Sequence, residues 1–155
     1  MDTQTSQSLA QLIRTQRIAA LATVSDAAPL VSMVQYATST DLSSFFILIS
    51  RLALHTQSIQ QNRRVGLMIM EQDSGEKDPQ TLARVSIRGE ATEMPSTAPA
   101  YEKTKAAYLE KFPRSALNFR LEDFNLYCIK PYNARYVEGF GKIFDLTAEE
   151  FRRLA

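Results

Sequence analysis

The segment SRLALHT, residues 50–56, places the single histidine of the chain among hydroxyl side chains. It follows an apolar stretch, residues 44–50, that is typical of a strand covered on both sides, and it leads into a Gln-rich stretch, residues 53–62, that favours a helix. Amides in the first turn of a helix have no partner within the helix, so they can bind phosphate. Ser50, His55 and Thr56 therefore predict a phosphate-binding site at this junction. The alternative is a serine N-cap beside a surface histidine.

Other common catalytic motifs are missing from the sequence. It contains neither GxGxxG nor GxxxxGK[ST], which excludes the usual dinucleotide and P-loop cradles. The only cysteine, Cys128, lies in an apolar stretch and is interpreted as a buried structural thiol. Because the chain has only one cysteine and one histidine, no metal site built from protein ligands is expected. No third residue can be assigned to a nucleophile triad with Ser50 and His55. The acidic residues within 71–78 are interpreted as a solvated face.

The composition bounds the class of protein. A chain of 155 residues and 17.5 kDa, 45% apolar and 23% charged, is expected to form one globular domain over residues 1–155. A net charge of +1 gives no indication of a nucleic-acid partner. The polar N-terminus does not resemble a secretory signal and no apolar run reaches membrane length, so we expect no membrane partner and a cytoplasmic location.

Strands and helices are expected around the junction. Hydrophobic periodicity predicts strands at residues 18–24, 30–37, 44–50, 64–71, 84–94, 124–130 and 133–138, and helices at residues 7–16, 53–62, 98–111 and from Thr147 onward. Ser6 or Ser8 would cap the first helix, and Thr147 with Glu150 forms a capping box for the last. Gly89, in mid-strand, predicts a bulge or a close backbone approach.

Seven clustered strands and four helices predict a mainly β fold with flanking helices (α+β), built as a closed or nearly closed barrel. Residues 71–83 are polar and contain Gly75 and Pro79, which predicts a long loop. Two apolar strands, residues 44–49 and 65–70, carry more two-sided apolar surface than a small barrel hides. We therefore expect a two-fold dimer that buries more than ~2,000 Å².

The segment LISRLALHTQSIQQNRRVGLMIME, residues 48–71, resembles the centre of the pyridoxamine 5′-phosphate oxidase-like FMN-binding split-barrel superfamily. It is most similar to the haem-utilisation branch, with Ser58 where that branch has Asn. Residues 29–34, 84–91 and 134–141 support the resemblance, which extends over about residues 7–145. It implies a split β-barrel of the FMN-binding type, assembled as a homodimer with the cofactor at the interface.

The resemblance also implies a set of cofactor-binding residues. Residues 32–34 would lie along the flavin ring, and Ser50, His55 and Thr56 would hold its phosphate. Arg84 falls beside a flavin-contacting position, with an ordinary surface arginine as the alternative. Phe140 and Lys142 would reach the cofactor from the partner subunit. The full set is Ser32, Met33, Val34, Ser50, His55, Thr56, Arg84, Phe140 and Lys142.

For Phe140, ordinary core packing is the alternative role.

The resemblance implies an FMN-dependent oxidoreductase with no catalytic side chain, in which the flavin supplies the redox chemistry. No histidine follows His55, so the substrate motif of true pyridoxamine-phosphate oxidases is missing and that activity is not expected. The alternatives are a non-catalytic haem-binding protein on the same barrel, with Tyr132 or Tyr136 as iron ligand, and an interaction module without FMN. The small-molecule substrate is not identified by the sequence.

Overall fold

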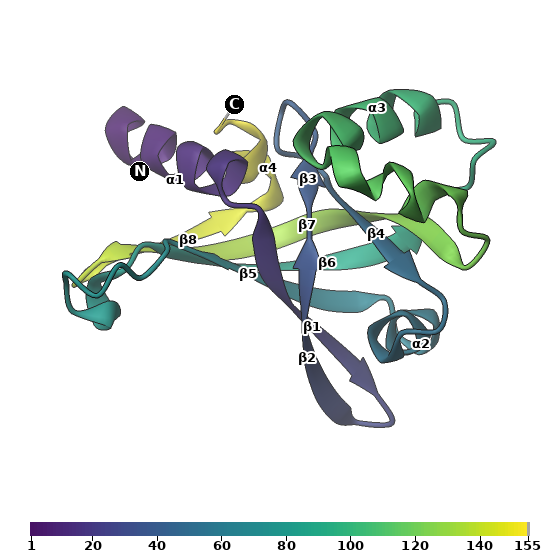
Figure 1. Cartoon of the computed structure of the whole chain (residues 1–155). Helices are drawn as coiled ribbons and strands as arrows, with labels where there is room; N and C mark the ends of the chain where they lie inside the picture. The colour runs from purple at the N-terminus through teal and green to yellow at the C-terminus, as the bar shows by residue number, and fades with distance from the viewer. Residues whose placement is uncertain (155) are drawn as a thin grey trace.

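All strands described by the computed structural model, which covers residues 1–154, belong to one antiparallel sheet (Figure 1). Ala155, the last residue of the predicted domain, lies outside the described residues. The elements are α1 (Thr3–Thr15), β1 (Ile18–Ser25), β2 (Ala28–Gln35), β3 (Ala37–Thr38), β4 (Phe45–Ser50), α2 (Leu54–Gln61), β5 (Arg64–Met70), β6 (Arg84–Glu93), α3 (Tyr101–Lys111), β7 (Phe124–Gly139), β8 (Lys142–Thr147) and α4 (Ala148–Arg152), with short 3-10 helices η1 (Pro79–Thr81), η2 (Pro113–Ala116) and η3 (Asn118–Arg120).

The strand order is β2-β1-β5-β6-β7-β4-β3, and β8 also pairs with β7. The sheet curls so that residues of β2 and β4 line a common pocket, although no hydrogen bond is recorded between these strands within residues 1–154. The barrel is thus split between β2 and β4. This confirms the predicted mainly β fold with flanking helices, of the split-barrel type, and the opening exposes backbone edges of both strands.

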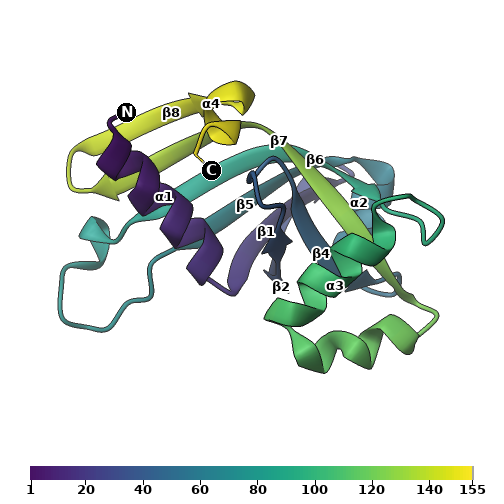
Figure 2. The same cartoon turned by 90° about the horizontal axis from the view of Figure 1, so that it is seen from above.

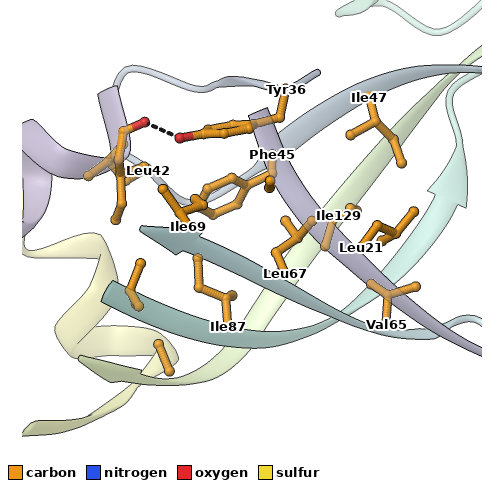
Figure 3. Close-up of a cluster of buried hydrophobic side chains, with 14 of the residues drawn as sticks. Leu21, Tyr36, Leu42, Phe45, Ile47, Val65, Leu67, Ile69, Ile87 and Ile129 are labelled. Carbon is orange, nitrogen blue, oxygen red and sulfur yellow. Dashed lines mark hydrogen bonds between the residues drawn. The ribbon is translucent and has the colours of Figure 1, made fainter. Parts of the chain in front are cut away.

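The larger of two clusters of buried hydrophobic residues fills the inside of the curled sheet. Figure 3 shows its centre, where Phe45 and Tyr36 pack among aliphatic side chains from several strands. The Tyr36 ring is fully buried, and its hydroxyl donates to the Ile13 carbonyl at 2.6 Å, which ties α1 to the barrel. Figure 2 shows α1 and α4 together over one part of the sheet, with α3 at the other end.

The first and last helices differ in how well the sequence predicted their starts. The helix α1 begins at Thr3 because Asp2, rather than Ser6 or Ser8, caps it by accepting a hydrogen bond from the Thr5 amide at 2.7 Å. The predicted Ser caps are therefore wrong. The capping box of Thr147 and Glu150 is confirmed at the start of α4.

The middle of the sheet contains the predicted irregularity at Gly89. The β6–β7 register shifts between Arg88 and Gly89, and a Cβ placed on Gly89 would lie 2.5 Å from the Lys130 carbonyl oxygen. Pro131 pairs with Gly89 at this bulge, where its missing N–H breaks no regular ladder. As a result β7 runs unbroken from Phe124 to Gly139, and the prediction of two separate strands is wrong.

Two further expectations are corrected near the C-terminus and in β5. The residues after Gly141 form β8, an eighth strand that pairs with β7 and that no sequence pattern predicted. In β5 burial alternates along the strand, so Met68 and Met70 remain 39% and 40% exposed while their neighbours face the core. Of the two strands expected to be apolar on both faces, β4 is covered on both sides, whereas the outward side chains of β5 form part of an exposed apolar surface.

Candidate functional site

A pocket of about 300 Å³ lies at the split of the barrel, beside the start of α2. We call it the α2 pocket. Its wall is formed by β2, by β4 and by the first residues of α2. The edges of β2 and β4 that face the pocket have no strand partner. The lining residues are Met33, Val34, Gln35, Leu48, Ile49, Ser50, Ala53, His55 and Phe124.

The N-terminus of α2 is uncapped. Its N-cap residue is Ala53, which provides no side-chain acceptor, and the Thr56 amide donates to the Ala53 carbonyl at 3.1 Å. Within residues 1–154 the amides of Leu54 and His55 have no hydrogen-bond acceptor. Unpaired amides together with the helix dipole create positive potential at this point, which favours an anion.

His55 contributes a buried side-chain nitrogen to the α2 pocket that is not already engaged. Its Nε2 atom is buried and has no hydrogen-bond partner among the described residues. Burial lowers the pKa of His55 below its usual value, so the imidazole is neutral at pH 7 in the absence of a ligand. An anion in the pocket would favour the protonated form and would supply the partner that Nε2 lacks.

The two hydroxyls predicted to assist His55 have other partners. Ser50 Oγ donates to the Asp123 carboxylate and accepts from the Leu52 amide at 3.1 Å. Thr56 is fully buried, and its hydroxyl donates to the Ser50 carbonyl at 2.6 Å. A phosphate could take the Ser50 proton only by displacing Asp123, and Thr56 acts by shaping the turn.

Asp123 is a site residue that sequence reasoning missed. It precedes β7, far from Ser50 in the chain, and it reaches the site because β4 pairs with β7 so that Ser50 lies opposite Phe124. No local motif marks it, since its role depends on a strand pairing over 73 residues. The pairing also excludes a triad based on Ser50, whose hydroxyl proton goes to Asp123 and not to His55.

The remaining predicted residues lie outside the α2 pocket. Ser32 lines a second cavity, described below. Arg84 donates to the Gln80 and Leu82 carbonyls at 3.2 and 2.9 Å and lines neither cavity. Phe140 is 86% exposed at the β7–β8 turn, which excludes core packing within this chain, and Lys142 pairs with Glu138 at 3.5 Å.

The second cavity, of about 910 Å³, lies on the outer face of the sheet. Met33, on the boundary between the two cavities, lines both of them. Met33 and Met68 flank Ala20, because β1 pairs with both β2 and β5 at that residue. The exposed apolar side chains of this region, which we call the outer sheet face, are Ile18, Val31, Met33, Met68 and Met70.

The two tyrosines considered as haem ligands differ in accessibility. Tyr132 is 45% exposed, whereas Tyr136 is buried in the core and burial raises its pKa to about 12. Cys128 is buried, as predicted, and burial raises its thiol pKa. Among the residues described, no cluster of three His, Cys, Asp or Glu side chains is arranged to hold a metal ion. None of the helices in residues 1–154 has the length and apolar character needed to cross a membrane.

The sequence matches the family model described as pyridoxamine 5′-phosphate oxidase over residues 5–138. A curated relative, the haem oxygenase HutZ of Vibrio cholerae, is 24% identical over 107 residues. The match covers 68% of this chain and 61% of HutZ, so the chain spans less than two thirds of that relative.

Solved structures share the fold. A haem-binding protein from Mycobacterium smegmatis superposes with a TM-score of 0.86 at 20% identity, over 99% of this chain and 61% of that one. HutZ itself, described in that structure as a haem storage protein, gives a TM-score of 0.72 at 21% identity, over 88% and 91% of the two chains. ChuZ of Campylobacter jejuni gives 0.84 at 17% identity, over 97% and 62%.

Proposed function

Because the chain belongs to the pyridoxamine 5′-phosphate oxidase family, we propose that it is an FMN-binding flavoprotein whose α2 pocket holds the flavin phosphate. The observation that carries the proposal is the donor set at the start of α2. Two amides without acceptors, those of Leu54 and His55, lie beside a buried imidazole nitrogen that also has no partner. Such a set suits a phosphate, which offers only acceptors at neutral pH.

The split of the barrel suits the rest of the flavin. The backbone of residues 33–35 and 48–50 forms the two edges of the α2 pocket, and these edges have free peptide groups for the polar rim of the ring system. Met33 would place its apolar side chain against the ring. When bound, the flavin would supply hydride or electron transfer, and the protein would hold and orient it.

A second copy of the chain would complete the site. The outer sheet face exposes apolar side chains next to the α2 pocket, with Val31 69% and Met33 65% exposed. Contiguous apolar surface of this kind is typical of a protein interface. We propose a homodimer through this face, with Phe140 of the partner subunit and Lys142 of the partner subunit approaching the cofactor.

Haem is the second candidate cofactor, because the relatives HutZ and the Mycobacterium smegmatis protein are described as haem proteins. Haem iron needs an axial ligand such as His, Cys, Met or Tyr. Cys128 and Tyr136 are buried within the fold, so the candidates that line the two cavities or are exposed include His55, Tyr132 and the methionines of the outer sheet face. The proposed protein would then be a haem-binding protein without flavin.

Titration of the apo-protein with both cofactors distinguishes the two candidates. We expect one molecule of FMN to bind per chain, with its fluorescence quenched by the protein. FMN should bind more tightly than haemin, whose binding is measured by its Soret absorbance. The variant His55→Ala should lose FMN affinity and keep its residual haemin binding, while Gln57→Ala, an exposed change in the same helix, should alter neither. Stoichiometric haemin binding that disappears in His55→Ala, with no FMN binding, would reverse the ranking.

A further inference from the structure

The turn that joins β4 to α2 is held by Asp123, the residue that precedes β7. The Ser50 hydroxyl donates to the Asp123 carboxylate and accepts from the Leu52 amide at 3.1 Å. The Arg51 amide donates to the Asp123 carbonyl at 2.7 Å. Asp123 therefore contacts the turn through both its side chain and its backbone, and the side-chain contact is made to a residue that lines the α2 pocket.

The negative charge of Asp123 is not paired with a cation. Within residues 1–154 no lysine, arginine or histidine forms an ion pair with this carboxylate. Arg51, which contacts its backbone, directs its guanidinium to the Glu122 carbonyl at 3.0 Å. Asp123 is half-buried, so solvent and salt screen its charge less than at an exposed position. An unpaired negative charge thus lies one hydroxyl group away from the α2 pocket.

The α2 pocket itself contains little positive charge. Among residues 1–154, the nine that line it include no lysine and no arginine. The groups that favour an anion are the free amides of Leu54 and His55 and the His55 imidazole, which is neutral at pH 7 before a ligand binds. A bound anion would therefore be attracted by partial charges and repelled by the full charge of Asp123.

We propose that Asp123 sets how tightly the α2 pocket holds a phosphate, and that its carboxylate keeps the phosphate ligand exchangeable. This inference rests on the proposed function, in which the pocket receives the flavin phosphate. Asp123 does not line the pocket, so it acts through Ser50 and is a positioning residue. It accepts the Ser50 proton, which leaves that hydroxyl with no proton to donate to a phosphate.

The two effects of Asp123 act in the same direction. A phosphate monoester is negatively charged at neutral pH, so the carboxylate repels it. The Ser50 oxygen, whose proton is engaged, can offer the phosphate only lone pairs. FMN held in this way would dissociate and rebind as a substrate does, whereas a prosthetic group stays bound through purification. Riboflavin, which has no phosphate, would be little affected by Asp123.

The variant Asp123→Asn separates charge from shape. Its amide oxygen can still accept the Ser50 proton, so the turn keeps this hydrogen bond while the charge is lost. We expect it to bind FMN about three- to tenfold more tightly than the native protein, to bind riboflavin equally, and to retain more FMN on gel filtration. The matched control is Glu122→Gln, which makes the same change of charge on an exposed side chain and should stay within about twofold of the native affinity.

Inorganic phosphate tests the same pocket without a flavin. His55 is the only histidine of the chain, so the ring signals of histidine in the NMR spectrum report directly on this pocket. In titrations at pH 7 and constant ionic strength, phosphate should bind Asp123→Asn about three- to tenfold more tightly than the native protein. Glu122→Gln should behave as the native protein does.

The results for Asp123 and for the flavin assignment can be told apart. Tighter phosphate binding in Asp123→Asn, with no FMN binding in any variant, would support the role of Asp123 and contradict the flavin assignment. FMN affinity that is unchanged or lowered in Asp123→Asn, or a gain that riboflavin shares, would overturn the role of Asp123 and leave the flavin assignment standing. Native protein that retains one FMN per chain through gel filtration would overturn exchangeable binding.

Discussion

At the scale of the residue, His55 links protonation to ligand binding. Burial lowers its pKa in the free protein, and an anion at Nε2 would raise it, so binding of a phosphate takes up a proton. Ser50 and Thr56 share the segment but direct their hydroxyl protons to Asp123 and to a backbone carbonyl. The same short motif thus contains one free donor and two structural hydroxyls.

This linkage predicts a pH dependence for the proposed FMN site. Affinity for FMN should fall as pH rises through the pKa of His55 in the complex, by up to tenfold per pH unit, because the phosphate-bound state holds the extra proton. Affinity for riboflavin, which has no phosphate, should change little. In His55→Ala the FMN curve should lose this component. Fluorescence titrations at several pH values measure both, and equal losses for FMN and riboflavin in His55→Ala would show that His55 is not at the phosphate.

Lys111 predicts that the stability of the fold depends on pH, because its amine releases a proton more readily in the folded protein than in the unfolded chain. Burial at the end of α3 lowers the pKa of Lys111 to about 8 in the folded protein, below the usual value for lysine, so below pH 8 the fold retains a charge that it disfavours. As pH rises from 8 to 10 the folded state releases this proton before the unfolded state does, and this contribution to the free energy of unfolding increases.

Urea unfolding of the native protein and of Lys111→Met at pH 7 and pH 9.5 isolates this contribution. The native protein should gain stability relative to Lys111→Met as pH rises, while Lys103→Met, at an exposed position of the same helix, should show no such relative change. A relative loss for the native protein over this interval would contradict the assignment.

At the scale of the element, the β6–β7 bulge depends on a residue without a side chain. A Cβ on Gly89 would lie 2.5 Å from the Lys130 oxygen and 3.0 Å from its carbonyl carbon, both of them backbone atoms of the neighbouring strand. Because backbone atoms cannot move aside as the end of a flexible side chain can, β6 and β7 would have to separate to admit the new Cβ. The bulge is also what allows Pro131 to lie within a continuous β7.

Gly89→Ala should therefore lower the free energy of unfolding by about 1–3 kcal/mol or more. The matched control is Gly66→Ala in β5, where the new Cβ would lie 3.5 Å from the Ala22 Cβ, an ordinary contact. This change should be close to neutral, since it also restricts the unfolded chain. Chemical denaturation measures both, and similar losses for the two variants would show that the close approach at Gly89 is not limiting.

At the scale of the whole molecule, the outer sheet face predicts the assembly. Strands β2, β1 and β5 direct apolar side chains outward, and their inner faces already fill the core. Light scattering at micromolar concentration should give twice the chain mass of 17.5 kDa. A monomer would contradict the proposed dimer and, with it, the roles of Phe140 and Lys142.

The variant Val31→Glu tests which surface is used. Val31 is 69% exposed, so the glutamate should be tolerated by the folded chain but should oppose burial between two copies. We expect a shift toward monomer and weaker FMN binding. Leu117→Glu, at a 68% exposed position between η2 and η3, should leave the mass unchanged. A dimer that is unaffected by Val31→Glu would place the interface elsewhere.

The sequence by itself determined the mainly β class, most strand positions, the bulge at Gly89, the capping box of α4 and the family. These depend on periodicity, on backbone freedom and on short motifs, all of which are local. Only the tertiary structure decided that Asp123 takes the Ser50 proton, that β7 is continuous, that β8 exists, and that Lys111 lies beside Arg17 and Tyr36. Each of these results from packing between segments far apart in the chain, whose energies no local pattern records.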